Sequence, residues 1–286
     1  MRIHLRRRQN IDDENDAAAE NEAAERFSRN LLRLGNGEVC ADQNGQIDMK
    51  DFGKSVESLN VLITSVFPNI TERYESWPKF NYEWLCGRAI LAPKNDIVED
   101  INLKLLPQIP TGDTSLYKSI DTIIDSAESV HYPIEFLNSL DLPGVPPHRL
   151  QLKPGVPIML LRNLDPPKLC NGTRLAVYRL REHVIEAIIL DGIFKQQHVF
   201  IPRVPIIPSK LPFQFKRLQF PVRLSFAMTI NKSQGQSLKI AGINLTYPCF
   251  SHGQLYVACS RVGSPDKLFI LTPNGKSTNV VYPEAL

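Results

Sequence analysis

The sequence predicts an α/β fold in which a parallel sheet is interrupted by a small inserted β-barrel. Three observations support this fold class: a strand followed by a helix at residues 88–105, a proline-rich run of short strands at 143–217, and a return to strand, loop and helix after residue 218. A strand joined to a helix is the building block of parallel sheets. We therefore expect residues 41–142 and 218–286 to form one sheet domain and residues 143–217 to form the barrel.

The first strand and helix follow from the hydrophobic pattern. The apolar run Ala89–Ala92 is typical of a short buried strand, which Pro93 ends. Asp96 and Glu99 match a capping box at the start of the helix. Apolar residues then recur at helical spacing at Ile97, Ile101 and Leu105. Upstream, residues 1–40 are expected to contain a separate helix between Asp16 and Leu34, and residues 35–50 a loop rich in Gly, Asn and Asp.

The inserted domain is predicted from short strands and tight turns. Eleven of the 22 prolines lie in residues 143–217, and Asn171-Gly172 and Asp191-Gly192 are hairpin turn signals. Several short strands without a helix between them suggest a small barrel. The expected strands are Val156–Leu161, Arg174–Tyr178, Val184–Leu190 and His198–Ile201. After the insertion we expect strands at Val222–Ala227 and Lys267–Leu271 and a helix at His252–Cys259.

Charge is distributed unevenly along the chain. Residues 145–286 hold 18 lysines and arginines but only 6 acidic residues, whereas residues 1–144 hold 15 basic and 24 acidic residues. The net charge of +3 hides this difference. A basic half on a nearly neutral chain suggests a polyanion partner, although a solvated basic surface would look the same.

Several classes of protein are disfavoured. The five cysteines include no C-x-x-C pair, and the six histidines are scattered, so we expect reduced thiols, no disulfide framework and no metal centre. No apolar run is long enough to span a bilayer, so no membrane partner is expected.

One candidate site lies in Phe226–Gln236, where a strand ends in a polar loop. Such loops face the crevice at the carboxyl edge of an open sheet, where ligands bind. Four side chains could donate hydrogen bonds to backbone phosphates: Thr229, Asn231, Lys232 and Ser233. Gln234, followed by Gly235, could sense a nucleotide phosphate. An ordinary polar loop with a helix cap would have the same composition.

The second candidate is Arg261, at the carboxyl end of the apolar stretch Ser251–Arg261. Simple helix capping explains an arginine there, since cations suit that end of a helix. The functional alternative is an arginine finger, a guanidinium that stabilises charge on a transferring phosphoryl group.

Together these segments resemble the fifth and sixth motifs of superfamily-one helicases, and the match is closest to the PIF (petite integration frequency) type, especially its transposon-borne, Helitron-like branch. The resemblance covers nearly the whole chain from Leu31 onward. Further stretches resemble the same family: Ala89–Asp96, Tyr132–Leu140, Pro157–Asp165, Leu169–Arg174 and Leu211–Phe215.

The resemblance implies a C-terminal half: a second RecA-like domain that carries a Src-homology-like barrel. It implies an ATP-dependent 5′→3′ DNA helicase of the nucleus, acting in repair, recombination, telomere maintenance or transposon replication. It places Thr229, Asn231, Lys232 and Ser233 near single-stranded DNA, with Lys94 and Asn95 lining the cleft. It also makes Gln234 and Gly235 the link between DNA and nucleotide, and Arg261 the arginine finger.

The family holds ATP and Mg²⁺ with a P-loop on a first RecA-like domain, of which residues 1–40 would be a remnant. Gly275-Lys276-Ser277 resembles the end of a P-loop, but Ile270 stands where the first glycine is needed. We therefore expect this chain alone not to hydrolyse ATP. Two alternatives stay open: a non-enzymatic remnant that binds single-stranded DNA, and a structural domain that needs a separate P-loop chain.

Overall fold

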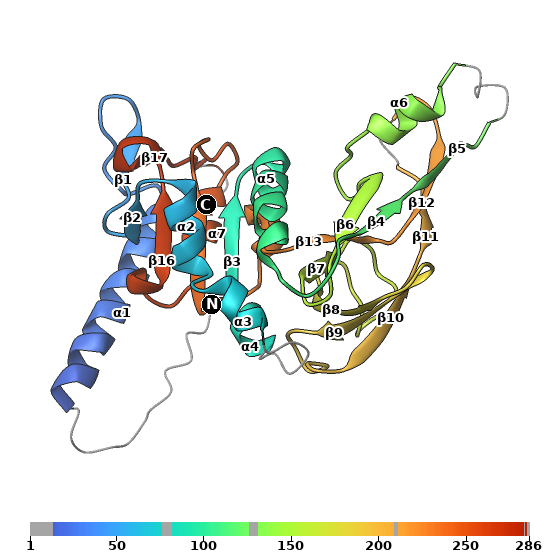
Figure 1. Ribbon diagram of the computed structural model, residues 1–286. Coiled ribbons are helices and arrows are strands. Elements are labelled where there is room, and N and C mark those ends of the chain that lie inside the picture. The colour runs from blue at the N-terminus through green and yellow to red at the C-terminus, as the bar shows by residue number, and fades with distance from the viewer. Residues whose placement is uncertain (1–13, 76–81, 126–130, 209–210, 283, 285–286) are drawn as a thin grey trace.

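The computed structural model describes residues 14–75, 82–125, 131–208, 211–282 and 284. They form two bodies side by side, one around a parallel sheet and one of antiparallel strands (Figure 1). The first 13 residues of the predicted amino-terminal segment lie outside this description. Within it, no helix has both the length and the apolar character needed to cross a membrane.

The first body contains a five-stranded sheet in which all neighbouring strands are parallel. Helix α5 (Asn95–Leu105) follows the strand at residues 88–92, as the sequence predicts. The predicted α/β fold with a parallel sheet is therefore confirmed. The strand order is β14 (Ala227–Thr229), β3 (Arg88–Ala92), β15 (Ile240–Asn244), β16 (Leu268–Leu271) and β2 (Lys54–Val56).

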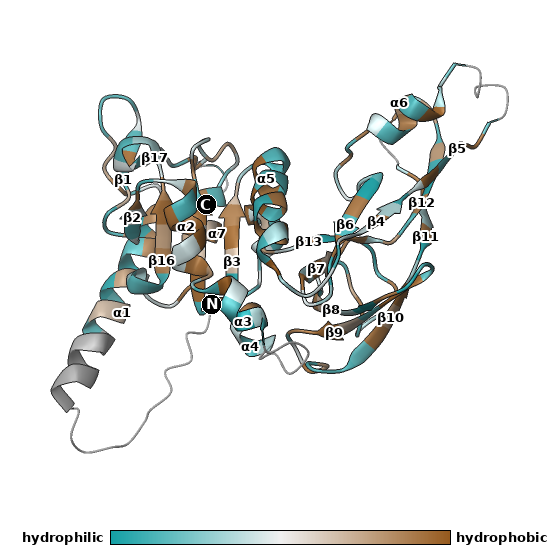
Figure 2. Ribbon diagram, in the orientation of Figure 1, coloured by the Kyte–Doolittle hydropathy of each residue, from teal (hydrophilic) through white to brown (hydrophobic). Residues whose placement is uncertain are grey.

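Helices cover both faces of this sheet. Helices α2 (Leu59–Val66) and α5 pack on one face, and α7 (Gln254–Cys259) with α1 (Glu14–Gly35) on the other. Alternate residues of β3 therefore enter different cores: Ile90 lies with Leu62, whereas Leu91 lies with Phe27. Strand β16 is hydrophobic throughout and β3 is hydrophobic after Arg88 (Figure 2), which is typical of strands buried on both faces.

Smaller elements complete the first body. These are α3 (Ile70–Tyr74), α4 (Tyr82–Cys86), the antiparallel pair β1 (Gln46–Asp48) and β17 (Lys276–Thr278), and the 3-10 helices η1 (Leu106–Gln108), η2 (Ile230–Ser233), η3 (Pro265–Lys267) and η4 (Pro273–Gly275).

The second body contains a five-stranded antiparallel sheet in the order β10, β9, β8, β7, β13. Four of its strands match the predicted ones: β7 (Pro157–Leu160), β8 (Arg174–Leu180), β9 (Val184–Ile189) and β10 (His198–Pro202). Among the described pairings β10 and β13 (Val222–Leu224) are open edges, so the closed barrel stays a prediction.

Two further sheets and one helix extend the second body. They are β11 (Val204–Ile206) with β12 (Phe215–Gln219) and β5 (Ile120–Ile123), β4 (Ser115–Lys118) with β6 (Arg149–Leu152), and α6 (Ile134–Ser139). Because β4, β5 and β13 pair inside the second body, it reaches beyond the predicted bounds of 143 and 217 on both sides.

Four local predictions need correction. The single strand expected at Val222–Ala227 is two strands in different sheets, β13 and β14. The expected loop at 35–50 contains β1, whose partner β17 lies more than 200 residues away. The helix expected from His252 begins at Gln254. At α5 the N-cap is Lys94, which has no side-chain cap bond, and Asp96 accepts instead from the N–H of Ile97 at 2.9 Å.

Two buried arginines connect separate elements of the structure. Arg174 on β8 crosses between the bodies and donates to the carbonyl oxygens of Cys86 and Arg88, each at 2.9 Å. Arg217 on β12 pairs with Asp121 on β5 at 2.7 Å, and both side chains are fully buried. One apolar core continues across the boundary between the bodies, from Leu62 on α2 to Ile201 on β10.

Candidate functional site

A groove runs along the carboxyl edge of the parallel sheet, between the two bodies. Strands β3 and β14 are parallel neighbours, so the loops that follow them meet at this edge. The second body contributes the opposite wall, through β7, β13 and residues 143–144. The groove, about 590 Å³ in volume, is lined by Pro93, Lys94, Asn95, Val98, Pro143, Gly144, Met159, Leu161, Arg223, Leu224, Ser225, Ala227, Met228, Thr229, Asn231, Lys232 and Phe250.

The structure brings most of the candidate residues together. Five of the six predicted DNA contacts line the groove: Lys94, Asn95, Thr229, Asn231 and Lys232. Ser233 lies apart from them, because its side chain is buried and its hydroxyl donates to the carbonyl of Ile230 at 2.7 Å. Ser233 therefore shapes the loop and does not face the groove.

Gln234 and Gly235 lie in a second recess. It is lined by Asn171, Gly172, Asn231, Lys232, Gln234, Gly235 and Gln236. Gly235 has a φ of +81°, a left-handed conformation that glycine adopts without strain, so the loop turns at this residue. Asn231 and Lys232 belong to both the groove and the recess, which are therefore adjacent.

The charge of the groove is one-sided. Its lining includes Lys94, Arg223 and Lys232 but no aspartate or glutamate, and the recess has no carboxylate either. Arg223 does have a partner outside the lining, since it pairs with Asp141 at 2.5 Å and also donates to the carbonyl of Val145 at 2.7 Å. Lysine and arginine along a carboxylate-free groove favour a polyanion.

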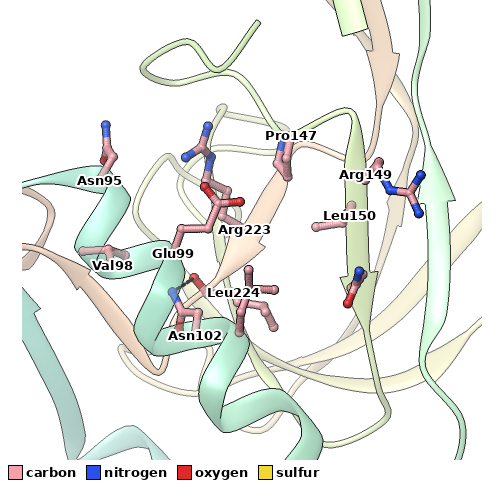
Figure 3. A pocket seen from close by; sticks show the side chains of 11 residues that line it. Asn95, Val98, Glu99, Asn102, Pro147, Arg149, Leu150, Arg223 and Leu224 are labelled. Carbon is pink, nitrogen blue, oxygen red and sulfur yellow. Dashed lines mark hydrogen bonds between the residues drawn. The ribbon is translucent and has the colours of Figure 1, made fainter. Parts of the chain in front are cut away.

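The groove ends at a smaller cleft between α5 and β6 (Figure 3). Here Glu99 projects from α5 towards Arg223, so a carboxylate marks the end of the positive lining. Asn102 on the same helix donates to the carbonyls of Leu224 at 3.3 Å and Ala227 at 3.0 Å. It also accepts from the N–H of Ala227 at 2.9 Å, which fixes the point where the chain passes from β13 to β14.

Two exposed aromatic side chains lie beside the groove, and the sequence analysis did not find them. Phe250 lines the groove with 59% of its surface exposed, and Tyr247 is 50% exposed. The Nζ of Lys94 lies 4.1 Å from the centre of the Tyr247 ring, a cation–π contact. An exposed aromatic in a basic groove, as Phe250 is, is suited to stack on bases. Tyr247 itself lines a neighbouring recess that contains three carboxylates. Their signal in the sequence, Tyr247 and Phe250 flanking Pro248-Cys249, resembles an ordinary loop.

Buried Gln254 on α7 links these groups. Its side chain accepts from the N–H of Phe250 at 3.1 Å and donates to the side-chain oxygen of Asn231 at 3.5 Å. The backbone of Phe250 and the side-chain amide of Asn231 are thus held by one residue, which supports a preformed site.

Arg261 follows α7, and its guanidinium is engaged in hydrogen bonds to other residues of this chain. Nε donates to Val257 at 2.7 Å, Nη1 to Ser233 at 3.1 Å and Gln236 at 2.9 Å, and Nη2 to the hydroxyl of Ser260 at 2.8 Å. These bonds use four of its five N–H groups. Burial lowers the pKa of Arg261 from its ordinary value. In this conformation Arg261 holds the loop after β14 in place.

The segment Gly275-Lys276-Ser277, which resembles the end of a P-loop in sequence, has a different structure. Lys276 lies in β17, where it pairs with β1, and its Nζ contacts Asp42 at 2.8 Å. A phosphate-binding lysine would instead stand at the start of a helix. Gly275-Lys276-Ser277 thus lies where the 3-10 helix η4 passes into strand β17.

Known proteins resemble this chain in sequence and in fold. The family model for the DNA helicase Pif1 2B domain matches residues 135–180, which run from α6 to the end of β8. The ATP-dependent DNA helicase PIF1 of Xenopus laevis is 28% identical over 184 residues, 63% of this chain and 27% of that protein. The crystal structure of Pif1 from Candida albicans superposes with a TM-score of 0.57 at 22% identity, covering 88% of this chain and 54% of that one.

The chain is therefore similar to Pif1 helicases in sequence and in fold. The resemblance predicted from the motifs is therefore confirmed, as is the RecA-like fold. The chain spans about a quarter of the length of the Xenopus relative. A Pif1 helicase from Bacteroides, solved with ADP-AlF3 and single-stranded DNA, has a TM-score of 0.56 at 20% identity and covers 90% of this chain and 51% of that one. The part of the second body that is similar to the Pif1 2B domain is residues 135–180.

Proposed function

We propose that this chain is the C-terminal part of an ATP-dependent 5′→3′ DNA helicase and that it contributes a single-stranded DNA groove. The observation that carries the proposal is the carboxylate-free groove, with Lys94, Lys232 and Arg223 along it and Phe250 exposed within it. Its relatives are ATP-dependent DNA helicases, and the Bacteroides structure holds single-stranded DNA. Nuclear localisation, a Helitron-like origin and roles in repair or recombination are proposed from the resemblance.

Each wall of the groove has a role in this proposal. Lys94 and Lys232 neutralise backbone phosphates, and Asn95, Thr229 and Asn231 donate hydrogen bonds to them. Phe250 stacks on a base, which tolerates any sequence because every base has a π-face. The groove lies between the bodies, so a bound strand contacts both.

The described residues do not form a complete nucleotide site. Arg261 keeps one N–H for an outside acceptor, and Lys276 is paired with Asp42. ATP bound to a P-loop would supply the energy for unwinding. We propose that hydrolysis needs a P-loop outside these residues. The role of Arg261 as an arginine finger is likewise a proposal and requires that it leave Ser233 and Gln236.

The second candidate is a binding module without enzymatic activity. The engagement of Arg261 with its own loop favours it, because this arginine already donates to the loop that lines the groove. Both candidates predict strand binding, and they differ in whether a P-loop is encoded upstream of residue 1.

We expect the chain to bind fluorescently labelled oligo-dT without nucleotide. The affinity should fall with salt, since each phosphate contact to a single strand contributes about −0.7 to the slope of log K against log salt. Lys232→Gln and Lys94→Gln should each reduce the slope by about 0.7, which is about fivefold in affinity at 0.1 M salt. Fluorescence anisotropy between about 50 and 200 mM salt measures both quantities.

Lys267→Gln is the matched control for this measurement. Lys267 is exposed in η3, directly before β16, and therefore lies at the amino edge of the sheet, opposite the groove. Its replacement removes the same charge and should leave the slope unchanged. Equal losses in all three variants would indicate non-specific attraction and contradict the groove.

We also expect no DNA-stimulated ATP hydrolysis by the chain alone, because phosphoryl transfer needs groups that cradle the phosphates. A phosphate-release assay with saturating oligo-dT tests this. Stimulated turnover that Arg261→Ala abolishes would show that the chain holds its own nucleotide site and would overturn the expectation.

A further inference from the structure

The loop 162–172 of the second body contacts the loop after β14. The Nζ of Lys232 donates to the side-chain oxygen of Asn171 at 2.8 Å, over a separation of 61 residues. Asn171 is held by its own loop, because its N–H donates to the side chain of Asn163 at 2.7 Å. The next residue, Gly172, donates to the carbonyl of Leu160 at 2.9 Å. The acceptor is thus presented to Lys232 by an ordered turn.

This contact lies at the boundary between the groove and the recess. Lys232 lines both, whereas Asn171 lines the recess alone. Lys94, Thr229 and Phe250 lie on the groove side. While Lys232 bonds to Asn171, the two spaces are separated by that side chain, although neither contains a carboxylate.

The partner of Lys232 is weak for a half-buried ammonium group. Burial lowers the pKa of Lys232, and the charge of Arg162 lowers it further. In the part of the chain that the structure describes, neither Lys232 nor Arg162 has a carboxylate partner. A neutral amide oxygen binds an ammonium less strongly than an anionic phosphate oxygen does. Arg162 lies in the chain between Leu161, which lines the groove, and Asn163, whose side chain holds Asn171. Two cations at this contact between loops, without a counter-charge, indicate a place for an anion.

We propose that a phosphodiester of the bound DNA strand displaces Asn171 from Lys232 and is held between Lys232 and Arg162. The strand then continues from the groove into the recess, past Gln234 and Gly235. The proposal rests on the proposed function and adds to it a phosphate contact from the second body. Asn171 acts as a competitor that occupies Lys232 when no strand is bound.

Two substitutions of Asn171 separate this competition from a structural role. Asn171→Asp keeps the shape but places a carboxylate on Lys232, so oligo-dT should bind at least about fivefold more weakly at 0.1 M salt, with the slope reduced by about 0.7. Asn171→Ala removes the competitor, so binding should be unchanged or tighter. Two variants that both match the parent, or that weaken binding alike, would overturn the proposal.

Arg162→Gln provides a second test that does not alter the turn at Asn171. It should reduce the salt slope by about 0.7, as one lost phosphate contact requires, while Lys267→Gln keeps the parent slope. If Asn171→Asp fails to fold by circular dichroism, Arg162→Gln decides alone, and an unchanged slope rejects the contact. If the unsubstituted protein binds oligo-dT but no substitution of Asn171 or Arg162 changes that binding, the inference is refuted and the proposed groove stands. Absence of binding by the parent would refute the proposed function itself.

Discussion

Replacing Asp121 by alanine is expected to lower the free energy of unfolding by about 3–5 kcal/mol, because it leaves a buried cation without its counter-charge. Arg217 donates to the carboxylate through Nε at 3.0 and 3.2 Å and through Nη2 at 2.7 Å. Both side chains are 0% exposed, so water cannot replace the lost partner. Urea unfolding followed by circular dichroism measures the change.

The remaining bonds of Arg217 explain why a buried ion pair is present here. Its other N–H groups donate to the carbonyls of Leu137 at 2.7 Å, Leu140 at 3.1 Å and Pro146 at 3.2 Å. The pair thus attaches the end of α6 and the following turn to β12 and β5. Breaking it should loosen the segment where the 2B match begins.

Asp141→Ala is the matched control for Asp121→Ala. Asp141 also pairs with an arginine, Arg223, but its side chain is 53% exposed. Exposed ion pairs contribute about 0–1 kcal/mol, so the control should unfold close to the parent. A double variant with Asp121→Ala and Arg217→Met should lose less than the two single losses combined. Equal losses at Asp121 and Asp141 would contradict the assigned role of burial.

The sequence predicted those parts of the fold that depend on neighbouring residues. The strand at Ala89–Ala92, the helix after it and the four strands between 157 and 202 have local periodicities and turn residues. Strands β4 and β5 were missed because their partners lie far along the chain. Residues 222–227 keep one alternating pattern although Ser225 and Phe226 pass from one sheet to another, so periodicity could not reveal the break.

The candidate site divides in the same way, into residues with a local sequence pattern and contacts that join distant parts of the chain. Thr229 was a candidate from its position at a strand end, because such loops face the ligand-binding edge of a sheet. Lys94 was placed in the cleft by the resemblance. The contact between Lys232 and Asn171 joins two bodies and has no local signal. Two acceptors of Arg261 are backbone carbonyls 25 and 28 residues earlier, and a backbone carbonyl has the same chemistry whatever the residue type. Arginines are mostly exposed, so nothing marked Arg174 or Arg217 as buried.

Arg174→Met should also destabilise the protein strongly, by roughly 3 kcal/mol, since several buried carbonyls lose their donor at once. Arg174 is 1% exposed. Besides Cys86 and Arg88, it contacts the carbonyls of Leu85 at 3.5 Å and Ser225 at 3.4 Å. Burial lowers the pKa of its guanidinium. Arg179→Met on the same strand is the control, because Arg179 is 55% exposed and lies 3.9 Å from Glu186.

The location of Arg174 gives this variant a second effect that Asp121→Ala lacks. Its acceptors on and around β3 belong to the first body, whereas Arg174 belongs to the second, and the groove is formed where these bodies meet. Loss of the contact should therefore lower the urea m-value and weaken oligo-dT binding under conditions where the protein stays folded. Arg174→Lys should not restore either property, because one ammonium cannot reach carbonyls on both sides as a planar guanidinium does. Binding that survives Arg174→Met unchanged would show that the groove does not depend on how the two bodies are held together.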